Sequence, residues 1–108
     1  MTATMNTISS QQLAQWKLQE VEHQLIDIRE AYEVETCHIS GAHIPMGEIV
    51  SRIGEIKRNI PVIIHCKSGR RSEAVATYLE RQGFSNVHSL EGGILSWIAS
   101  IDPSLEAY

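Results

Sequence analysis

The sequence predicts an α/β fold with a mostly parallel sheet, because short apolar segments alternate with helical segments along the chain. The clearest strand, residues 61–65 (PVIIH), is a continuous β-branched run typical of a strand that is covered on both faces. The length of 108 residues and the hydrophobic fraction of 43% fit a single globular domain over residues 1–108.

The N-terminal segment is expected to form a brief strand and then a helix. The strand is expected at residues 7–8, and Ser9 or Ser10 is a suitable cap for a helix over residues 11–19. The apolar stripe of this helix consists of Leu13, Trp16 and Leu18.

Residues 24–28 (QLIDI) then indicate a buried strand, followed by a short acidic turn or helix over residues 30–35. A weaker strand is expected at residues 42–44, where Pro45 ends it. Residues 47–57 are expected to be helical despite Gly54, because three isoleucines recur there at helical spacing, namely Ile49, Ile53 and Ile56.

The C-terminal half begins with the strand over residues 61–65. A polar loop over residues 66–71 follows it, and then a helix over residues 72–82 that Gly83 is placed to end. The remaining predicted elements are a strand over residues 86–88, a turn over 91–93, a helix over 94–100 and an irregular tail over 102–108.

Composition disfavours several classes of function. The formal charge of −4 and the lack of a sustained basic run argue against a nucleic-acid partner. No stretch approaches the roughly 20 apolar residues of a membrane span, and the N-terminus does not resemble a signal peptide. Two cysteines do not make a disulfide scaffold, so a cytoplasmic location is expected, where a free thiol can do chemistry.

The polar loop after the clearest strand is the strongest candidate site. It begins with Cys66, and its possible anion-binding residues are Lys67, Ser68, Gly69, Arg70, Arg71 and Ser72. Ligands of parallel α/β sheets bind at the carboxyl ends of strands. Inward N–H groups, a helix N-terminus and nearby basic residues favour a thiolate, the nucleophilic form of cysteine. The pattern indicates either a nucleophilic Cys66, which takes and passes on sulfur covalently, or a small cysteine that only packs.

These residues resemble the rhodanese family of sulfurtransferases. Residues 66–72 (CKSGRRS) are similar to the active-site pattern C-x-x-G-x-R-S. Residues 25–30 (LIDIRE), 38–45 (HISGAHIP) and 90–97 (LEGGILSW) resemble the family's D-x-R-E, G-H-I-x-G-A-x-x-I-P and L-x-G-G-x-x-x-W segments, in the expected order. Two departures concern the scaffold: Cys37 replaces the glycine before His38, and the segment between Ala42 and Ile44 is one residue short.

The resemblance implies a central, mostly parallel five-stranded sheet with helices on both faces. It also implies transfer of sulfane sulfur through a persulfide on Cys66, with no metal or organic cofactor. Thiosulfate or a persulfidated cysteine desulfurase is the implied donor. A six-residue loop favours sulfur, whereas the related dual-specificity phosphatases have a longer loop. Residues 97–108 are similar to the rhodanese domain of molybdopterin-synthase adenylyltransferases, which implies a sulfur-carrier protein as acceptor.

Several residues keep two interpretations. Cys37 is either a resolving thiol for Cys66 or a packing residue, and His65 is either a base or a residue packed beneath the loop. Asp27 and Arg29 either touch the loop or pair internally, and Arg71 binds either substrate or the domain's own carboxylates. Trp16 and Trp97 are expected to pack.

Two other classes of function stay open. A cysteine-dependent phosphatase or arsenate reductase would use the same thiolate on an oxyanion ester, and a rhodanese-fold interaction module would have no catalysis. The histidines show no metal-ligand spacing, so no metal site is expected.

Overall fold

The computed structural model describes residues 6–105, and these residues form a five-stranded sheet in which all four strand pairings are parallel. The strand order is β1-β5-β4-β2-β3. The strands are β1 (Thr7–Ile8), β2 (Gln24–Asp27), β3 (Ala42–His43), β4 (Val62–His65) and β5 (Val87–Leu90). The helices are α1 (Ser10–Leu18), α2 (Ala31–Thr36), α3 (Arg70–Arg81) and α4 (Gly93–Ser100). The predicted α/β class and parallel sheet are confirmed.

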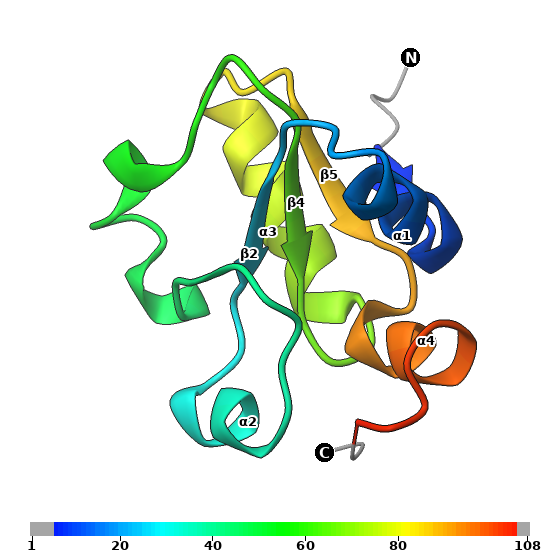
Figure 1. Cartoon of the computed structure of the whole chain (residues 1–108). Helices are drawn as coiled ribbons and strands as arrows, with labels where there is room; N and C mark the ends of the chain where they lie inside the picture. Colours follow the sequence, from blue (N-terminus) through cyan, green and yellow to red (C-terminus); the bar gives the residue numbers. More distant parts are fainter. Residues whose placement is uncertain (1–5, 106–108) are drawn as a thin grey trace.

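Helices cover both faces of the sheet, as expected (Figure 1). Side chains alternate along each strand, so β2 directs Leu25 to one face and Ile26 to the other, and β4 separates Ile63 from Ile64 in the same way. Helices α1 and α4 cover one face through Leu13, Ile94 and Trp97, and α3 covers the other through Val75, Ala76 and Leu79. The carboxyl ends of the central strands therefore lie between two packed layers.

Helix α1 begins one residue earlier than predicted, with Ser9 as its cap. The Ser9 hydroxyl accepts a hydrogen bond from the Gln12 amide at 3.1 Å, which satisfies one of the free first-turn donors. Leu13 is buried and Trp16 is partly buried, as expected, but Leu18 is 85% exposed. The predicted apolar stripe was wrong at Leu18, because at about 3.6 residues per turn Leu18 lies about 140° around the helix from Leu13 and about 160° from Trp16, on the side away from the core.

The predicted helix over residues 47–57 is wrong. The structure has two short 3₁₀ turns there, Met46–Glu48 and Ile53–Glu55, separated by hydrogen-bonded turns. Ile49 and Ile56 still reach the core on the α3 face, so the apolar spacing reflects burial rather than one continuous helix. Glycines at two positions and several β-branched residues lower the helix propensity of this segment.

Boundaries around the candidate loop also shift. Helix α3 begins at Arg70 rather than at residue 72, because Gly69 takes a left-handed conformation (φ 105°) and serves as the N-cap. Strand β5 extends to Leu90, two residues beyond the predicted end. Residues 102–105 are irregular, as predicted, and the rest of the predicted tail, residues 106–108, lies outside the described residues. No helix within residues 6–105 is long and apolar enough to cross a membrane.

Candidate active site

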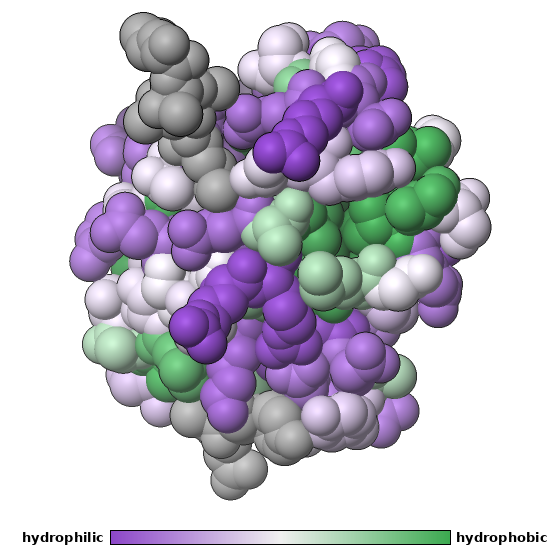
Figure 2. Space-filling view, turned by 180° about the vertical axis from the view of Figure 1, so that it is seen from behind, coloured by the Kyte–Doolittle hydropathy of each residue, from purple (hydrophilic) through white to green (hydrophobic). Residues whose placement is uncertain are grey.

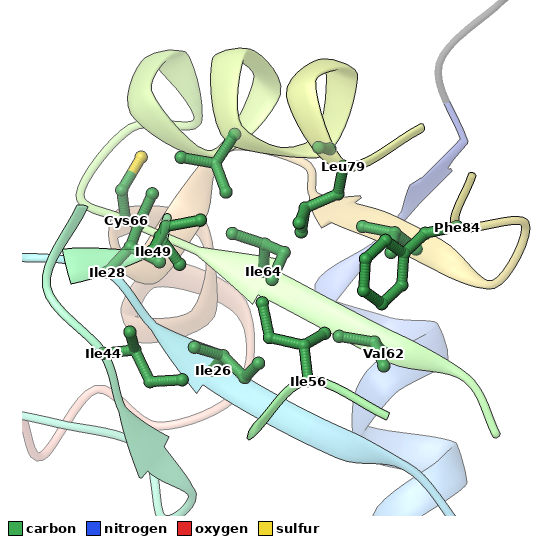
Figure 3. Close-up of a cluster of buried hydrophobic side chains, with 13 residues drawn as sticks. Ile26, Ile28, Ile44, Ile49, Ile56, Val62, Ile64, Cys66, Leu79 and Phe84 are labelled. Carbon is green, nitrogen blue, oxygen red and sulfur yellow. The ribbon is translucent and has the colours of Figure 1, made fainter. Parts of the chain in front are cut away.

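Cys66 lies immediately after β4 and is 1% exposed. Its side chain belongs to the apolar cluster on the α3 face, together with Ile28, Ile64 and Val75. Figure 3 shows Cys66 at one end of this cluster, with its sulfur directed toward the loop that leads into α3. The sulfur therefore lies between apolar core side chains on one side and the polar loop on the other.

Backbone N–H groups of the loop point at the Cys66 sulfur. The amide of Gly69 donates to Sγ at 3.1 Å, and the amide of Ser72 donates to it at 3.4 Å. Gly69 can present its amide this way because its left-handed φ of 105° is accessible to glycine and strained for other residues. Two N–H donors at the start of α3 stabilise negative charge on sulfur. The predicted cradle around Cys66 thus involves Gly69 and Ser72 directly.

The other predicted loop residues form the rim of the site. Ser68 and Arg70 are exposed and Lys67 is half-buried. Among residues 6–105, no acceptor is recorded for the backbone amides of Ser68, Arg70 and Arg71. Because these amides belong to the loop and to the start of α3, they are candidate donors to an anionic group bound to Cys66.

The N-terminus of α4 holds the loop backbone from the other side. The amide of Ile94 donates to the carbonyl of Cys66 at 2.9 Å, and that of Leu95 donates to the carbonyl of Lys67 at 3.1 Å. Gly93 allows this approach, because an added Cβ there would lie 2.6 Å from the Cys66 carbonyl oxygen. The L-x-G-G segment therefore anchors the backbone that carries the candidate nucleophile.

Arg71 binds a carboxylate of the domain itself, which resolves the two interpretations of this side chain. Nη1 donates to Glu33 Oε1 at 2.8 Å and Nη2 donates to Oε2 at 3.0 Å, a bidentate pair that joins α3 to α2. The hydrogen bonds to Glu33 raise the pKa of Arg71, and a smaller electrostatic contribution comes from Cys66. The same contact lowers the pKa of Glu33. Arg71 therefore adds positive charge near the sulfur, while its guanidinium is bound to the Glu33 carboxylate.

The Arg71–Glu33 pair is expected to stabilise the site as one unit. Arg71→Gln and Glu33→Gln should each lower the free energy of unfolding, and the double variant should lose about 1–2 kcal/mol less than their sum. Glutamine at residue 33 can still cap α2, where Glu33 accepts from the Glu30 amide. Urea unfolding of all four proteins measures this coupling.

A second ion pair in the same chain is the control for this cycle. Arg52 and Glu48 pair at 3.0 Å on the surface and should show no measurable coupling. Strictly additive losses at Arg71 and Glu33 would contradict the proposed unit.

Asp27 and Arg29 form an internal pair rather than part of the loop. Arg29 is 0% exposed; its Nη2 donates to Asp27 Oδ2 at 2.8 Å and also to the Cys37 carbonyl at 2.7 Å. Burial opposes ionisation of Asp27, but the hydrogen bonds from Arg29 outweigh it and hold the pKa of Asp27 below its ordinary value. The D-x-R-E motif therefore anchors the segment after α2 to the end of β2.

Cys37 packs in the apolar cluster on the α1 and α4 face, whereas Cys66 packs in the cluster on the α3 face. Both cysteines are free and buried. Placement in different clusters favours the packing role of Cys37 over a resolving thiol. Trp97 and Trp16 also pack against the cluster that contains Cys37, as predicted.

His65 is 0% exposed, so it packs in the interior rather than serving as a base for substrate. Its Nε2 lies 3.8 Å from Asp27 Oδ2, and neither ring nitrogen has a hydrogen-bond partner within residues 6–105. Burial lowers the pKa of His65 to about 4, although the Asp27 carboxylate opposes the shift. The ring is therefore neutral near pH 7.

Stability should fall on acidification because of His65. The unfolded chain binds a proton on this ring below pH 6.5, but the folded chain does so only near pH 4. The free energy of unfolding should drop by about 3 kcal/mol across this window. Urea unfolding between pH 7 and pH 4.5 measures the slope.

His65→Asn should remove this part of the slope and leave the smaller part from His88, whose pKa burial also lowers. Asp27 and Glu33 have lowered pKa values and act mainly below this window. An unchanged slope in His65→Asn would contradict the assignment to His65.

Two side chains at the site were not predicted. For Glu33 the sequence indicates only that it lies in an acidic segment, with no partner named. Ser89 lies one residue past the strand predicted over residues 86–88, so it was not expected near the loop. Ser89 is buried on β5, and its hydroxyl lies 2.7 Å from that of Ser72. A strand extended by two residues would have placed Ser89 beside the loop, but its partner depends on the packing of α3.

An apolar pocket of about 250 Å³ lies between α3 and residues 46–50. It is lined by Met46, Ile49, Val50, Ala74, Val75 and Tyr78. Figure 2 shows an apolar patch on this side of the molecule. None of the residues that line it belongs to the loop after Cys66, so the pocket is separate from the candidate site. Within residues 6–105, no cluster of three or more His, Cys, Asp or Glu side chains could hold a metal ion.

Known proteins share this sequence and fold. The model of the rhodanese-like domain family matches residues 9–100. The chain is 36% identical over 98 residues to the thiosulfate sulfurtransferase GlpE of Pseudomonas paraeruginosa, which covers 90% of this chain and 87% of GlpE. It is 42% identical over 74 residues to YrkF of Bacillus subtilis, covering 68% of this chain but only 40% of YrkF.

A solved rhodanese-like domain protein from Staphylococcus aureus has a TM-score of 0.83 at 30% identity and covers 96% of this chain and 99% of that one. The family match spans the strand before Cys66, the loop and the α4 segment that holds it. The similarity to these sulfurtransferases and rhodanese-like proteins supports sulfur transfer of the rhodanese type as a class of activity. The chain belongs to the rhodanese-like domain family.

Proposed function

We propose that this protein is a sulfurtransferase that carries sulfane sulfur as a persulfide on Cys66. The proposal rests on one observation: at the carboxyl end of β4, the Cys66 sulfur accepts hydrogen bonds from the backbone N–H groups of Gly69 and Ser72. Such donors favour a thiolate, and the same loop suits the anionic persulfide that replaces it. The proposed binding loop is Lys67, Ser68, Gly69, Arg70, Arg71 and Ser72.

The proposed chemistry is two displacements at sulfur. The Cys66 thiolate attacks the outer sulfur of thiosulfate, a new S–S bond forms, the S–S bond of thiosulfate breaks, and sulfite leaves with its electron pair. An acceptor nucleophile then attacks the outer sulfur of the persulfide, and the Cys66 thiolate is the leaving group. Each step conserves charge and needs no outside oxidant or reductant.

Access to the sulfur limits the proposed partners. Because Cys66 is almost completely buried, a donor or acceptor must reach it with a narrow group. Thiosulfate, cyanide and a small thiol satisfy this requirement, as does an extended protein terminus. We therefore propose thiosulfate or a persulfidated cysteine desulfurase as donor and a small thiol or the C-terminus of a sulfur-carrier protein as acceptor. The proposed location is the cytoplasm, where Cys66 stays reduced between cycles.

Intact-mass measurement of the reduced protein after incubation with thiosulfate tests this function. The expected result is a gain of about 32 Da, one sulfur, which cyanide removes as the second displacement requires. A protein that gains no sulfur from thiosulfate should then be offered a cysteine desulfurase with cysteine. Failure with both donors would overturn the proposal, and hydrolysis of an aryl phosphate would then be the next activity to measure.

A further inference from the structure

Ser89 is a buried serine whose hydroxyl has one recorded partner within residues 6–105. It lies on β5, is 1% exposed, and its Oγ is 2.7 Å from Ser72 Oγ. A buried hydroxyl without a hydrogen bond is unfavourable, so the orientation of the Ser89 proton depends on Ser72. Ser72 in turn lies against the Cys66 sulfur, at 3.6 Å from Oγ to Sγ. The two serines therefore form a short chain that ends at the candidate nucleophile.

The number of protons in this chain restricts which group donates. Ser72 Oγ lies 3.1 Å from the Gly69 carbonyl oxygen, which can only accept, so Ser72 donates there. Ser72 has no second proton, so Ser89 must donate to Ser72 Oγ. With Cys66 as a thiol, its S–H donates to the second lone pair of Ser72 Oγ. Every proton then has an acceptor.

Loss of the Cys66 proton to a solvent base changes one bond in this arrangement. The thiolate can only accept, so the Ser72 hydroxyl can rotate from the Gly69 carbonyl to Sγ. The Gly69 carbonyl keeps a donor, because it also accepts from the Glu73 amide at 3.0 Å. Ser89 continues to donate to Ser72 Oγ, which leaves the Ser72 proton free for the sulfur.

We propose that Ser89 is a positioning residue for Cys66: by donating to the Ser72 hydroxyl, it directs the single Ser72 proton to the thiolate. The inference rests on Cys66 being the nucleophile of the proposed function, not on any sulfur donor. Ser89 touches neither the sulfur nor substrate, and it acts through Ser72. Without the Ser89 hydroxyl, Ser72 Oγ loses a donor and is a weaker donor to the thiolate.

The charged groups around Cys66 stay the same when Ser89 is changed. Lys67 and Arg70 lie in the loop or at its end, and Glu73 lies in the first turn of α3. Arg71 adds positive charge near Cys66 while its guanidinium is paired with Glu33. His65 is buried beside Asp27 and is neutral near pH 7. A shift in the pH dependence of Cys66 reactivity in a Ser89 variant therefore reports the hydroxyl chain.

The test is the rate of alkylation of Cys66 by iodoacetamide as a function of pH. Mass analysis of the peptide containing Cys66 excludes the signal of Cys37. Ser89→Ala should move the half-maximal rate to higher pH and slow alkylation on the acidic side of that point by about three- to tenfold, while the plateau at high pH stays unchanged. Ser89→Thr, which keeps the hydroxyl, should retain the wild-type profile.

Two comparisons make the result decisive. Ser10→Ala removes another buried serine hydroxyl, which donates to Ser96 at 3.1 Å, and should leave the profile unchanged. Ser72→Ala should shift the profile, and adding Ser89→Ala to it should have no further effect, because Ser89 acts through Ser72. An unchanged profile in Ser89→Ala, or equal shifts in Ser89→Ala and Ser10→Ala, would overturn the inference. Alkylation uses no sulfur donor, so failure of sulfur loading leaves this test intact.

Discussion

Cys66→Ser is expected to lower sulfur transfer from thiosulfate to cyanide by at least about 1,000-fold, to the background of the uncatalysed reaction. Serine keeps the shape of the residue and can still accept from the Gly69 and Ser72 amides. It cannot form a persulfide, because a persulfide needs a sulfur atom on the side chain and serine has a hydroxyl oxygen there. The loss should therefore appear as an absent reaction step rather than as weaker binding.

The chain offers a matched control in its second cysteine. Cys37 is also free and buried, but it packs in the other apolar cluster. Cys37→Ala should retain both the sulfur gain in intact mass and most of the transfer rate. Loss of transfer in Cys37→Ala with a folded protein, or sulfur loading that survives Cys66→Ser, would place the nucleophile elsewhere.

Asp27→Leu is expected to destabilise the fold by about 3–5 kcal/mol, because it leaves the Arg29 guanidinium buried without its carboxylate. Arg29 donates to both carboxylate oxygens of Asp27, with Nε to Oδ1 at 3.0 Å and Nη2 to Oδ2 at 2.8 Å. Its contact with the Cys37 carbonyl cannot replace a counter-charge. Urea unfolding at pH 7 measures the loss.

The double variant Asp27→Leu/Arg29→Met distinguishes an unpaired charge from general damage to the core. It removes both charges and should be more stable than Asp27→Leu alone, because no buried charge is left without a partner. The exposed Arg52–Glu48 pair again provides the control, since Glu48→Gln should leave stability unchanged. A double variant less stable than the single one would contradict this account.

The fold was predictable to the extent that it depends on local pattern. Strand β4 was recognisable because its apolar residues are continuous, and the loop after it because Gly69 and the basic residues interrupt that run. The same local signal misled over residues 47–57, where isoleucines at helical spacing reach the core from two 3₁₀ turns. Periodicity reports which side chains are buried, and several backbone paths can bury the same set.

Local sequence was therefore sufficient for the α/β alternation, the polar loop after β4 and the position of Cys66 at the end of a strand. It was not sufficient for the partners of the side chains around the sulfur. Arg71 meets Glu33 across 38 positions of sequence, and Ser72 meets Ser89 across 17. These contacts exist because α2 and β5 pack beside the start of α3, and the direction of a charged or hydroxyl side chain follows from that long-range packing rather than from its neighbours in the chain.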